Sequence, residues 1–373
     1  MLGTKFMGRA HSNAWMSVGK FFDVPLLPAM HTVVGRNAIE LRGFAERWGW
    51  QHHTTDWRAA VTAGEIGLVD IGTPNNVHAE QAIAALEAGK HVACEKPLAG
   101  TLADARAMAA AAEHATGTTS VWFNYRRVPA VAFAHQLVAA GKIGRIYHSR
   151  AVYLQSWGGP DTPLLWRFQG DIAGSGAHGD LNAHIIDAVR FVSGEEITVV
   201  EGAIEHTFIE ERTRLDAKAK AASTVDDTVM FLARLSGGGV ASFEATRLAT
   251  GSHNANRFEI HGERGALRFN MERMNELEFY DLSSDAAVQG WTTIDVTRGA
   301  DGHPYIAAWW PPSHGLGYEH TFVNQAADIL SQIGGGTPVA PLVDFADALQ
   351  TQLVLQAAIE SARHHEPVRI ADL

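Results

Sequence analysis

Two short stretches of the sequence carry side chains that could move a proton or hold a developing negative charge. The first is Glu95-Lys96-Pro97, which follows an apolar run where a buried strand should end. The second is the pair Asp180 and His184, which a helix would present on one face because they are four residues apart. A histidine, with a pKa of about 6.5, can accept a proton near neutrality, and a lysine can stabilise an oxyanion. Taken alone, the lysine could equally be a solvated strand-end residue, and the pair a surface pair or a helix cap.

The elements that must position these residues begin with a regular alternation in the first third of the chain. Strands are expected at 30–34, 66–71, 91–94 and 119–124, and helices at 39–48, 79–88 and 102–114. Such alternation with short connections predicts parallel strands, right-handed crossovers and helices on both faces of the sheet. A sheet of this kind binds ligands at the carboxyl ends of its strands, and Lys96 would stand at such an end.

After about residue 122 the pattern changes to strands separated by Gly-rich turns, with a few helices. Helices are expected at 130–140, 183–192, 318–332 and 344–363, and β-type segments at 145–154, 199–208, 229–235, 240–246, 258–262, 266–271 and 277–281. The predicted fold class is therefore α/β: a doubly wound parallel sheet over 1–123, then an α+β domain over 124–373 with a large, open, mostly antiparallel sheet. We expect a partner subunit to cover the open face, and the polar segment 212–223 to be a loop.

The N-terminal segment Gly3-Thr4-Lys5-Phe6-Met7-Gly8 leads into an expected helix. A Gly-rich turn at a helix N-terminus offers backbone N–H groups and a positive dipole end to a pyrophosphate. In the fingerprint G-x-G-x-x-G the middle glycine is replaced here by Lys5, which raises a steric question but could also supply a cation to the phosphates. Only two residues precede Gly3, too few for a first strand of ordinary length, and we expect a start upstream of Met1 rather than a damaged sheet.

The second expected strand ends at Val34-Gly35-Arg36-Asn37, without the acidic residue that would hold the ribose hydroxyls. Arg36 could stack on adenine or receive a 2′-phosphate. This favours NADP slightly over NAD, and both cofactors remain candidates.

Four stretches taken together resemble the Gfo/Idh/MocA family, the family of glucose–fructose oxidoreductase and inositol dehydrogenase. They are GTKFMGRAHS (3–12), GTPNNVHAEQAIAALEAGKHVACEKPL (72–98), FNYRRVPA (123–130) and AGSGAHGDLNAHIIDAVRFVSG (173–194). The resemblance covers essentially the whole chain in order. Within the family, VWFNYRRVPAVAFA (121–134), YLQSW (153–157), the run 166–168 and SFEATR (242–247) are similar to the levoglucosan dehydrogenase-like branch.

The resemblance implies a Rossmann domain, an open-faced substrate sheet, a homodimer or homotetramer formed through that sheet, and an NAD(P)-dependent activity. The implied reaction is oxidation of a ring hydroxyl, often at carbon 3, of a sugar, anhydrosugar or glycoside. Lys96 matches the catalytic lysine, and Asp180 and His184 match the D-x-x-x-H pair. The positions matched on the cofactor side are Thr73, Asn75, His78 and Glu95. Lys5 and the missing first strand depart from the family pattern, as does Asn182, which stands where glycine is common and could shape substrate choice.

The chemistry of alcohol oxidation gives each matched residue a role. A hydride must pass to the nicotinamide, the hydroxyl proton must leave, and alkoxide character must be stabilised in between. We expect His184 to be the general base, Asp180 to orient the substrate or a neighbouring base, and Lys96 to donate a hydrogen bond to the reacting oxygen. This interpretation requires the three side chains to converge on one oxygen beside the bound cofactor.

Three further polar residues are candidates, each with a plain structural alternative. Asn124 ends an expected strand and could contact the nicotinamide ribose. Arg126 could bind cofactor or substrate hydroxyls, or form a surface ion pair. His178 could be a second proton carrier or simply a loop histidine.

Aromatic and polar side chains at strand spacing are candidates for holding a sugar. Tyr153, Gln155 and Trp157 alternate, so that they would share a face of one strand. Rings can pack on the C–H face of a sugar while amides bind its hydroxyls. Trp166 and Arg167 could form another wall. Ordinary sheet packing is the alternative for this group.

Composition limits the remaining possibilities. The chain has 373 residues and a formal net charge of −11, which argues against binding nucleic acid or an anionic membrane surface. No apolar run approaches the ~20 residues needed to span a bilayer, and the first residues do not form a signal peptide, so we expect a cytoplasmic protein. The single cysteine, Cys94, excludes an intramolecular disulfide and is interpreted as a core residue. We expect no metal site.

Three functions compete at this point. The first is an NAD(P)-dependent sugar or glycoside dehydrogenase. The second is a hydrolase that uses tightly held NAD for transient oxidation and elimination at a glycosidic bond, with the same three residues. The third is a non-catalytic dinucleotide-binding regulator, which the set Lys96, Asp180 and His184 disfavours.

Overall fold

The computed structural model describes residues 1–216, 218–299 and 302–373. By its contacts the chain forms two compact units: Met1–Arg127 with Gly317–Leu349, and Val128–Leu316 with Gln350–Leu373. The sequence-based division assigns 317–349 to the second domain, whereas its contacts place it in the first unit. The reason is that α9 (Tyr318–Ile333) packs against α1 (Phe6–Phe21).

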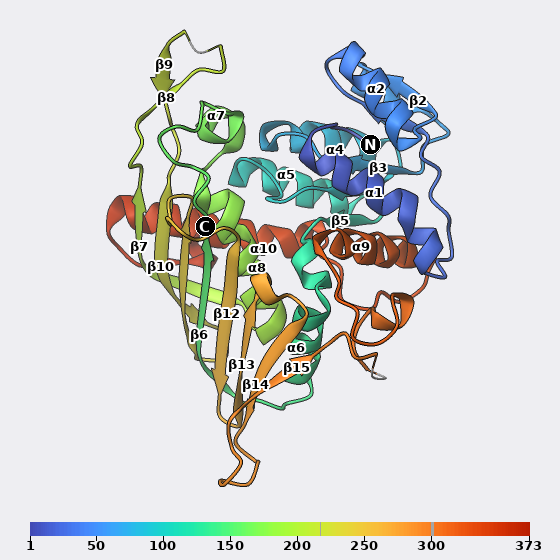
Figure 1. The fold of residues 1–373 in the computed structure, drawn as a ribbon. Coiled ribbons are helices and arrows are strands. Elements are labelled where there is room, and N and C mark those ends of the chain that lie inside the picture. Colours follow the sequence, from blue (N-terminus) through green and yellow to red (C-terminus); the bar gives the residue numbers. More distant parts are fainter. Residues whose placement is uncertain (217, 300–301) are drawn as a thin grey trace. The chain divides into compact units, whose positions relative to one another are not determined.

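The first unit is built on short parallel strands with helices between them (Figure 1). The strands are β1 (Thr32–Val34), β2 (His52–Thr54), β3 (Leu68–Ile71), β4 (His91–Cys94) and β5 (Thr119–Val121). The connecting helices are α2 (Ala38–Trp48), α3 (Trp57–Thr62), α4 (His78–Glu87) and α5 (Leu102–Glu113). β1 pairs with β2, and β4 lies between β3 and β5, all in parallel. The predicted parallel sheet is confirmed, and β2 and α3 are elements that the apolar pattern missed.

Residues Met1 to Gly3 lie between the two groups of strands. Leu2 forms isolated parallel bridges to Val34 of β1 and Ile71 of β3. Its N–H donates to the carbonyl of Asp70 at 2.7 Å, and its carbonyl accepts from Gly72 at 2.8 Å. A single residue thus joins β1 to β3 at the place where a central strand is expected.

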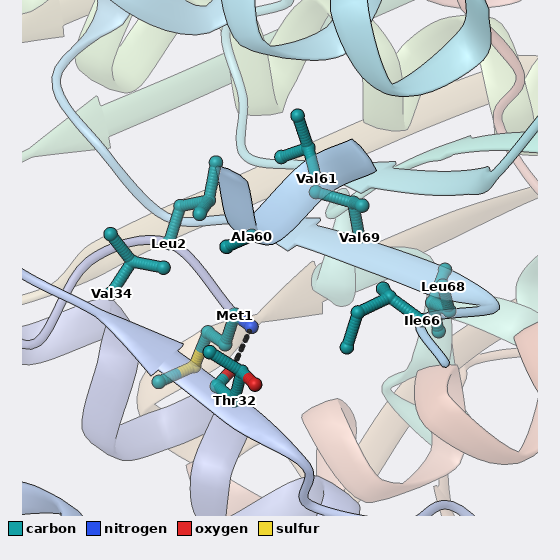
Figure 2. A pocket seen from close by; sticks show the side chains of 9 residues that line it. All are labelled: Met1, Leu2, Thr32, Val34, Ala60, Val61, Ile66, Leu68 and Val69. Atoms are coloured by element: carbon teal, nitrogen blue, oxygen red, sulfur yellow. Dashed lines mark hydrogen bonds between the residues drawn. The ribbon is translucent and has the colours of Figure 1, made fainter. Parts of the chain in front are cut away.

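An apolar pocket lies beside these first residues (Figure 2). It is lined by Met1, Leu2, Thr32, Val34, Ala60, Val61, Ile66, Leu68 and Val69. The α-amino group of Met1 donates to the carbonyl of Thr32 at 2.8 Å. No lining side chain is ionisable, and the α-amino group of Met1 is already bonded to Thr32.

The second unit is dominated by a nine-stranded sheet in the order β15-β14-β13-β12-β6-β11-β10-β7-β16. The strands are β6 (Ile146–Leu154), β7 (Ile197–His206), β10 (Thr228–Leu235), β11 (Val240–Thr246), β12 (Ala255–Gly262), β13 (Gly265–Asn270), β14 (Glu276–Asp281), β15 (Trp291–Asp295) and β16 (Val368–Arg369). All neighbours pair antiparallel except β11 with β6. The expected mostly antiparallel sheet is confirmed.

Helices α6 (Pro129–Ala139) and α8 (Ala183–Ser193) pack against this sheet, α8 on β6 and β12 and α6 on β13 and β14. The alternation of β10 shows the two faces: Val229 and Phe231 are buried, whereas Met230 and Leu232 are exposed. The strands of the sheet run side by side in Figure 1. The remaining helices are α7 (Gly170–Ala173) and α10 (Phe345–His364), and among the described residues none is long and apolar enough to cross a membrane.

The polar segment 212–223 is not an open loop as expected. Strand β8 (Glu211–Thr213) pairs antiparallel with β9 (Lys220–Ala222), and Ala217 between them lies outside the described residues. Arg212 is fully buried, and its guanidinium bonds to Asp227 at 3.2 Å. The segment 212–223 is thus anchored by the ion pair between Arg212 and the buried Asp227, although its polar composition predicts an exposed loop.

Candidate active site

Lys96 lies two residues after the end of β4, at the carboxyl end of the parallel strands, where the sequence predicts it. The backbone N–H of Glu95 still donates to Ile71 of β3 at 2.8 Å, so strand pairing continues to the residue before the lysine. The N–H of Lys96 itself donates to the Glu95 side chain, Oε2, at 3.1 Å. The Lys96–Pro97 peptide bond is cis. The backbone of Lys96 is therefore fixed by its own neighbour while its side chain is half-buried.

Beneath Glu95 lies a buried polar cluster that the sequence analysis missed. The His11 ring is fully buried, with Nδ1 3.0 Å from Asp70 Oδ1 and Nε2 3.0 Å from Glu95 Oε1. The indole N–H groups of Trp15 and Trp122 donate to Asp70 at 2.7 and 3.0 Å. Burial alone would lower the pKa of His11, but the charges and hydrogen bonds of Asp70 and Glu95 raise it to about 9. The signal that could have revealed the cluster is an aspartate inside the apolar strand Leu68–Ile71.

The N-terminal turn is tightly packed, which explains its two glycines. Gly3 has φ +105°, and a Cβ there would lie 2.5 Å from the carbonyl oxygen of Gly72. A Cβ at Gly8 would lie 2.5 Å from the carbonyl oxygen of Gly3. α1 begins at Phe6, after Lys5, so its N-terminal N–H groups open next to this turn. These features fit the pyrophosphate of a dinucleotide.

The side chains around this turn are mostly exposed. The Lys5 ammonium forms an ion pair with Glu40 at 2.8 Å, with both side chains in solvent. Phe6 is 57% exposed and stacks on Tyr318 of α9, and Met7 is half-buried. Arg36, after β1, is exposed. The roles predicted for these residues toward a cofactor remain predictions.

The turn after β3 is tied to the Lys96 segment by His78. This ring is fully buried, with Nε2 2.9 Å from the carbonyl of Thr73 and Nδ1 3.2 Å from the carbonyl of Pro97. Burial lowers the pKa of His78. A neutral ring carries one N–H and donates to only one of the two carbonyls at a time, so the ring lies between the two turns and is bonded to one of them. The Thr73 hydroxyl donates to Gln81 at 2.7 Å. Asn75 begins the short 3₁₀ helix Asn75–Val77 in the same turn.

Asn124 and Arg126 lie in a 3₁₀ turn, Asn124–Arg127, that follows β5. The Asn124 amide donates to the hydroxyl of Thr321 at 2.8 Å. Arg126 is buried and forms an ion pair with Asp347 at 3.0 Å. For Arg126 the structure shows the ion pair that sequence analysis kept as an alternative, although it is buried rather than on the surface.

In the second unit, Asp180 and His184 lie where a π-helical turn, His178–Asn182, runs into α8. The sequence analysis predicted an α-helix through both residues, whereas Asp180 lies in a π turn. π turns inserted into helices are frequent at functional sites. The turn is reached through Gly174, at φ +80°, and Gly176. A Cβ on Gly176 would overlap the carbonyl oxygen of Asp226, so only glycine fits there.

Asp180 is held by Arg247, which the sequence analysis quoted in SFEATR but gave no role. Arg247 Nη2 lies 3.0 Å from Asp180 Oδ2, and the arginine side chain is only 1% exposed. Arg247 Nη1 donates to the carbonyl of Arg167 at 3.1 Å. The guanidinium also lies 5.0 Å from the centre of the Trp157 ring. The buried Arg247 cation therefore fixes Asp180. The one signal for this role in the sequence is that Arg247 stands at the end of the stretch SFEATR.

The predicted sugar-facing residues are linked by hydrogen bonds. The Tyr153 hydroxyl donates to Asn254 Oδ1 at 2.7 Å, and the Gln155 amide donates to the same oxygen at 2.9 Å. Trp157 Nε1 donates to Gln155 Oε1 at 2.6 Å. The Tyr153 ring lies 5.9 Å from the His184 ring, which is 7% exposed. β6 ends at Leu154, so the expectation that all three residues share one strand is wrong: Tyr153 lies in β6, whereas Gln155 and Trp157 follow it. The hydrogen bonds still link the three, and Asn254 is a partner that the sequence analysis missed.

Trp166 and Arg167 lie in the 3₁₀ turn Trp166–Phe168. The Arg167 guanidinium carbon is 4.5 Å from the centre of the Trp166 ring, and both side chains are half-buried. The two residues therefore form one stacked unit. A wall of the substrate pocket remains their predicted role.

His178 is buried and fully paired. Nε2 lies 2.9 Å from the carbonyl of Leu355, which only accepts, and Nδ1 lies 2.9 Å from the amide nitrogen of Asn182, which only donates. The ring is therefore neutral with its proton on Nε2, and burial lowers the pKa of His178 accordingly. This arrangement favours a structural role for His178. Asn182 also donates to the carbonyl of Val229, so both residues anchor the π turn.

Cys94 is fully buried, as predicted, and burial raises the pKa of its thiol. Within residues 1–216, 218–299 and 302–373, no group of three or more His, Cys, Asp or Glu side chains is arranged to hold a metal ion. Each unit brings its own set of residues together. The convergence of Lys96 with Asp180 and His184 stays a prediction.

Comparison with known proteins gives matches over nearly the whole chain. Residues 1–123 match the family model described as oxidoreductase family, NAD-binding Rossmann fold, and residues 131–268 match the GFO/IDH/MocA C-terminal domain. Levoglucosan dehydrogenase of Pseudarthrobacter phenanthrenivorans is 42% identical over 97% of this chain and 95% of its own.

Two solved structures are similar over 99% of this chain. An oxidoreductase domain protein from Kribbella flavida is 48% identical, with a TM-score of 0.95 over 97% of that chain. Levoglucosan dehydrogenase in complex with NADH and levoglucosan is 42% identical, with a TM-score of 0.93 over 98% of that chain.

Proposed function

Because the chain belongs to the GFO/IDH/MocA oxidoreductase family, we propose that it oxidises a ring secondary hydroxyl of an anhydrosugar or glycoside and passes the hydride to NAD. Carbon 3 is the expected position of that hydroxyl. The observation that carries the proposal is Lys96, fixed at the carboxyl edge of the parallel strands in a chain that is similar over its full length to a levoglucosan dehydrogenase. Relatives such as levoglucosan dehydrogenase and D-glucoside 3-dehydrogenase are dehydrogenases, so the hydrolase alternative is not favoured.

NAD, when bound, accepts the hydride, and the chain supplies position and electrostatics. The turn Gly3–Gly8 and the N-terminus of α1 would hold the pyrophosphate. Lys96 donates a hydrogen bond to the reacting oxygen and stabilises its negative charge. His184 takes the hydroxyl proton, and Asp180, fixed by Arg247, orients the substrate.

The test is a screen of levoglucosan, inositols, hexoses and glycosides with NAD and with NADP, followed by the absorbance of the reduced nicotinamide. Lys96→Ala should lower kcat by about 10²- to 10³-fold, since it removes the oxyanion donor. His184→Ala should lower kcat by about 10²- to 10⁴-fold, since it removes the base. Lys20→Ala and His53→Ala are matched controls, because both side chains are exposed.

Near-normal turnover in both site variants would overturn the assigned roles. Release of an aglycone without net reduction of the cofactor would favour the hydrolase. A preference for NAD is expected from the NADH complex of the relative, whereas a larger kcat/KM with NADP would assign Arg36 to the 2′-phosphate.

We also propose that two copies of the chain associate through the open face of the nine-stranded sheet. Ile204, Met230 and Leu232 are 66%, 42% and 60% exposed on this face and lie on the neighbouring strands β7 and β10. Apolar groups clustered on a sheet face are stabilised when a second copy covers them. Leu232→Asp should therefore yield monomers in light scattering, whereas Ile39→Asp, at an exposed position of α2, should not. Unchanged mass in the first variant would contradict this interface.

A cytoplasmic location is also proposed. It is supported by a single, buried cysteine, as is usual for proteins kept in a reducing compartment. Fractionation of cells that express the protein would test it.

A further inference from the structure

The cluster of His11, Asp70 and Glu95 is a group of buried ionisable side chains that the proposed proton and hydride transfers do not use. All three side chains are at least nine-tenths buried. His11 comes from α1, Asp70 from β3, and Glu95 from the residue after β4. The His11 ring stacks on Trp122, with ring centres 4.2 Å apart, and also contacts Phe322 of α9.

The hydrogen bonds determine where the proton of this cluster lies. Asp70 accepts from two indole N–H groups as well as from His11 Nδ1, and three donors stabilise an ionised carboxylate. Glu95 Oε2 accepts from the Lys96 N–H, and its Oε1 faces His11 Nε2. Ionised carboxylates only accept, so both ring nitrogens of His11 must donate. The ring is therefore an imidazolium between two carboxylates.

The same contacts connect the imidazolium to the expected catalytic lysine. One oxygen of Glu95 is held by His11 and the other holds the backbone N–H of Lys96. We propose that His11 is a positioning residue for Lys96: its charged ring fixes the Glu95 carboxylate, and Glu95 fixes the backbone from which the Lys96 side chain extends. This inference rests on the proposed function of Lys96.

A role in packing alone does not explain the cluster. Replacing a buried ionic group with apolar side chains of similar volume is often neutral or stabilising, so burying three ionisable groups is a poor way to fill a core. The charges in the cluster instead fix the orientation of the Glu95 carboxylate. A carboxylate between a fixed cation and a backbone N–H has one orientation, and the position of a catalytic group matters to within about 1 Å.

The test compares four variants by kcat at saturating substrate and cofactor. His11→Gln removes the cation and should lower kcat by about 10- to 100-fold, while KM for the sugar changes by less than about twofold, because the loss concerns the transition state. Glu95→Gln should lower kcat less than Glu95→Ala does, since its amide oxygen can still accept from Lys96 and its N–H₂ can donate to a neutral His11. Glu95→Ala should be as slow as His11→Gln.

The double variant His11→Gln with Glu95→Gln provides the decisive comparison. Two amides can pair with each other and leave an oxygen for the Lys96 N–H, so kcat should recover at least about fivefold over His11→Gln alone. Ser12→Ala is the control: Ser12 is equally buried on α1 but bonds to Trp50, at 3.0 Å. It should lower thermal stability and leave kcat unchanged.

Each outcome decides the inference. Normal kcat in His11→Gln, or no recovery in the double variant, would show that His11 does not act through Glu95. If His11→Gln does not fold, equal kcat values for Glu95→Ala and Glu95→Gln overturn the inference, and a clearly larger kcat in Glu95→Gln than in Glu95→Ala supports it. A normal Lys96→Ala would instead refute the proposed function, whereas a slow Lys96→Ala beside a normal His11→Gln refutes this inference only.

Discussion

The buried imidazolium should make the stability of the protein depend on pH in a defined direction. A histidine whose pKa is raised on folding binds its proton more tightly in the native state. Its contribution is therefore fully present below the unfolded pKa of about 6.5 and is lost as the pH rises through the folded pKa. For His11 the folded pKa is raised to about 9, where the attraction of Asp70 and Glu95 outweighs burial.

The magnitude follows from the two pKa values. A rise from 6.5 to about 9 corresponds to about 3 kcal/mol of free energy of unfolding, lost progressively between these pH values. In a protein that begins at Met1, the Met1 amine has the opposite effect: burial lowers its pKa to about 6, against the attraction of Asp70, so that stability rises between about pH 6 and about pH 8. The contribution of His11 must therefore be isolated by difference.

The reference for this difference is the double variant His11→Gln with Glu95→Gln. This variant keeps the Met1 amine and Asp70. It removes His11, and it also removes the Glu95 carboxylate, which could otherwise bind a proton in place of His11. Urea unfolding followed by tryptophan fluorescence, from about pH 6 to about pH 10, gives the free energy of unfolding of both proteins. The wild-type advantage should shrink by about 3 kcal/mol over this interval. A constant or growing difference would show that His11 is not charged in the folded protein.

Two further predictions concern the second unit. Arg247→Met should lower kcat about tenfold and the free energy of unfolding by about 2 kcal/mol, since Asp180 loses its charged partner; an unchanged kcat in steady-state assays would remove Asp180 from the site. Gly176→Ala should lower the free energy of unfolding by about 2–3 kcal/mol, because its Cβ overlaps the carbonyl of Asp226. Gly43→Ala, in the open middle of α2, should instead raise it by about 1 kcal/mol, and equal thermal shifts for the two alanines would contradict the packing argument.

The strand and turn around Lys96 could be predicted because their signals are local. An apolar run, a glycine before it and a charged pair after it place β4 and its carboxyl end without any knowledge of distant contacts. Asp180 and His184 are predicted as site residues from their spacing and from the family resemblance, and this remains a prediction. The π turn that contains Asp180 could not be predicted, since nothing in a spacing of four distinguishes it from an α-helix.

What could not be predicted depends on partners far apart in the chain. β2 is polar and mostly exposed, so no apolar pattern marks it, and it forms by pairing with β1. His11 and Asp70 meet across 59 residues, and each alone is a polar residue in an amphipathic or apolar segment. Arg247 reaches Asp180 across 67 residues. These pairs can be recognised only when the fold shows which distant residues lie within hydrogen-bonding distance.

The single-residue bridge at Leu2 has a consequence for motion within the first unit. Among the described residues, the backbone hydrogen bonds that connect β1 to β3 run through Met1 to Gly3. Few backbone hydrogen bonds between β1 and β3 mean a low free energy of local opening. At this seam, formed by Met1 to Gly3, amide hydrogens should therefore exchange with solvent sooner than those between β3 and β4. Gly3 belongs both to the seam and to the turn expected to hold a pyrophosphate. A dinucleotide bound in the turn would therefore stabilise the connection between β1 and β3 and slow amide hydrogen exchange at the seam.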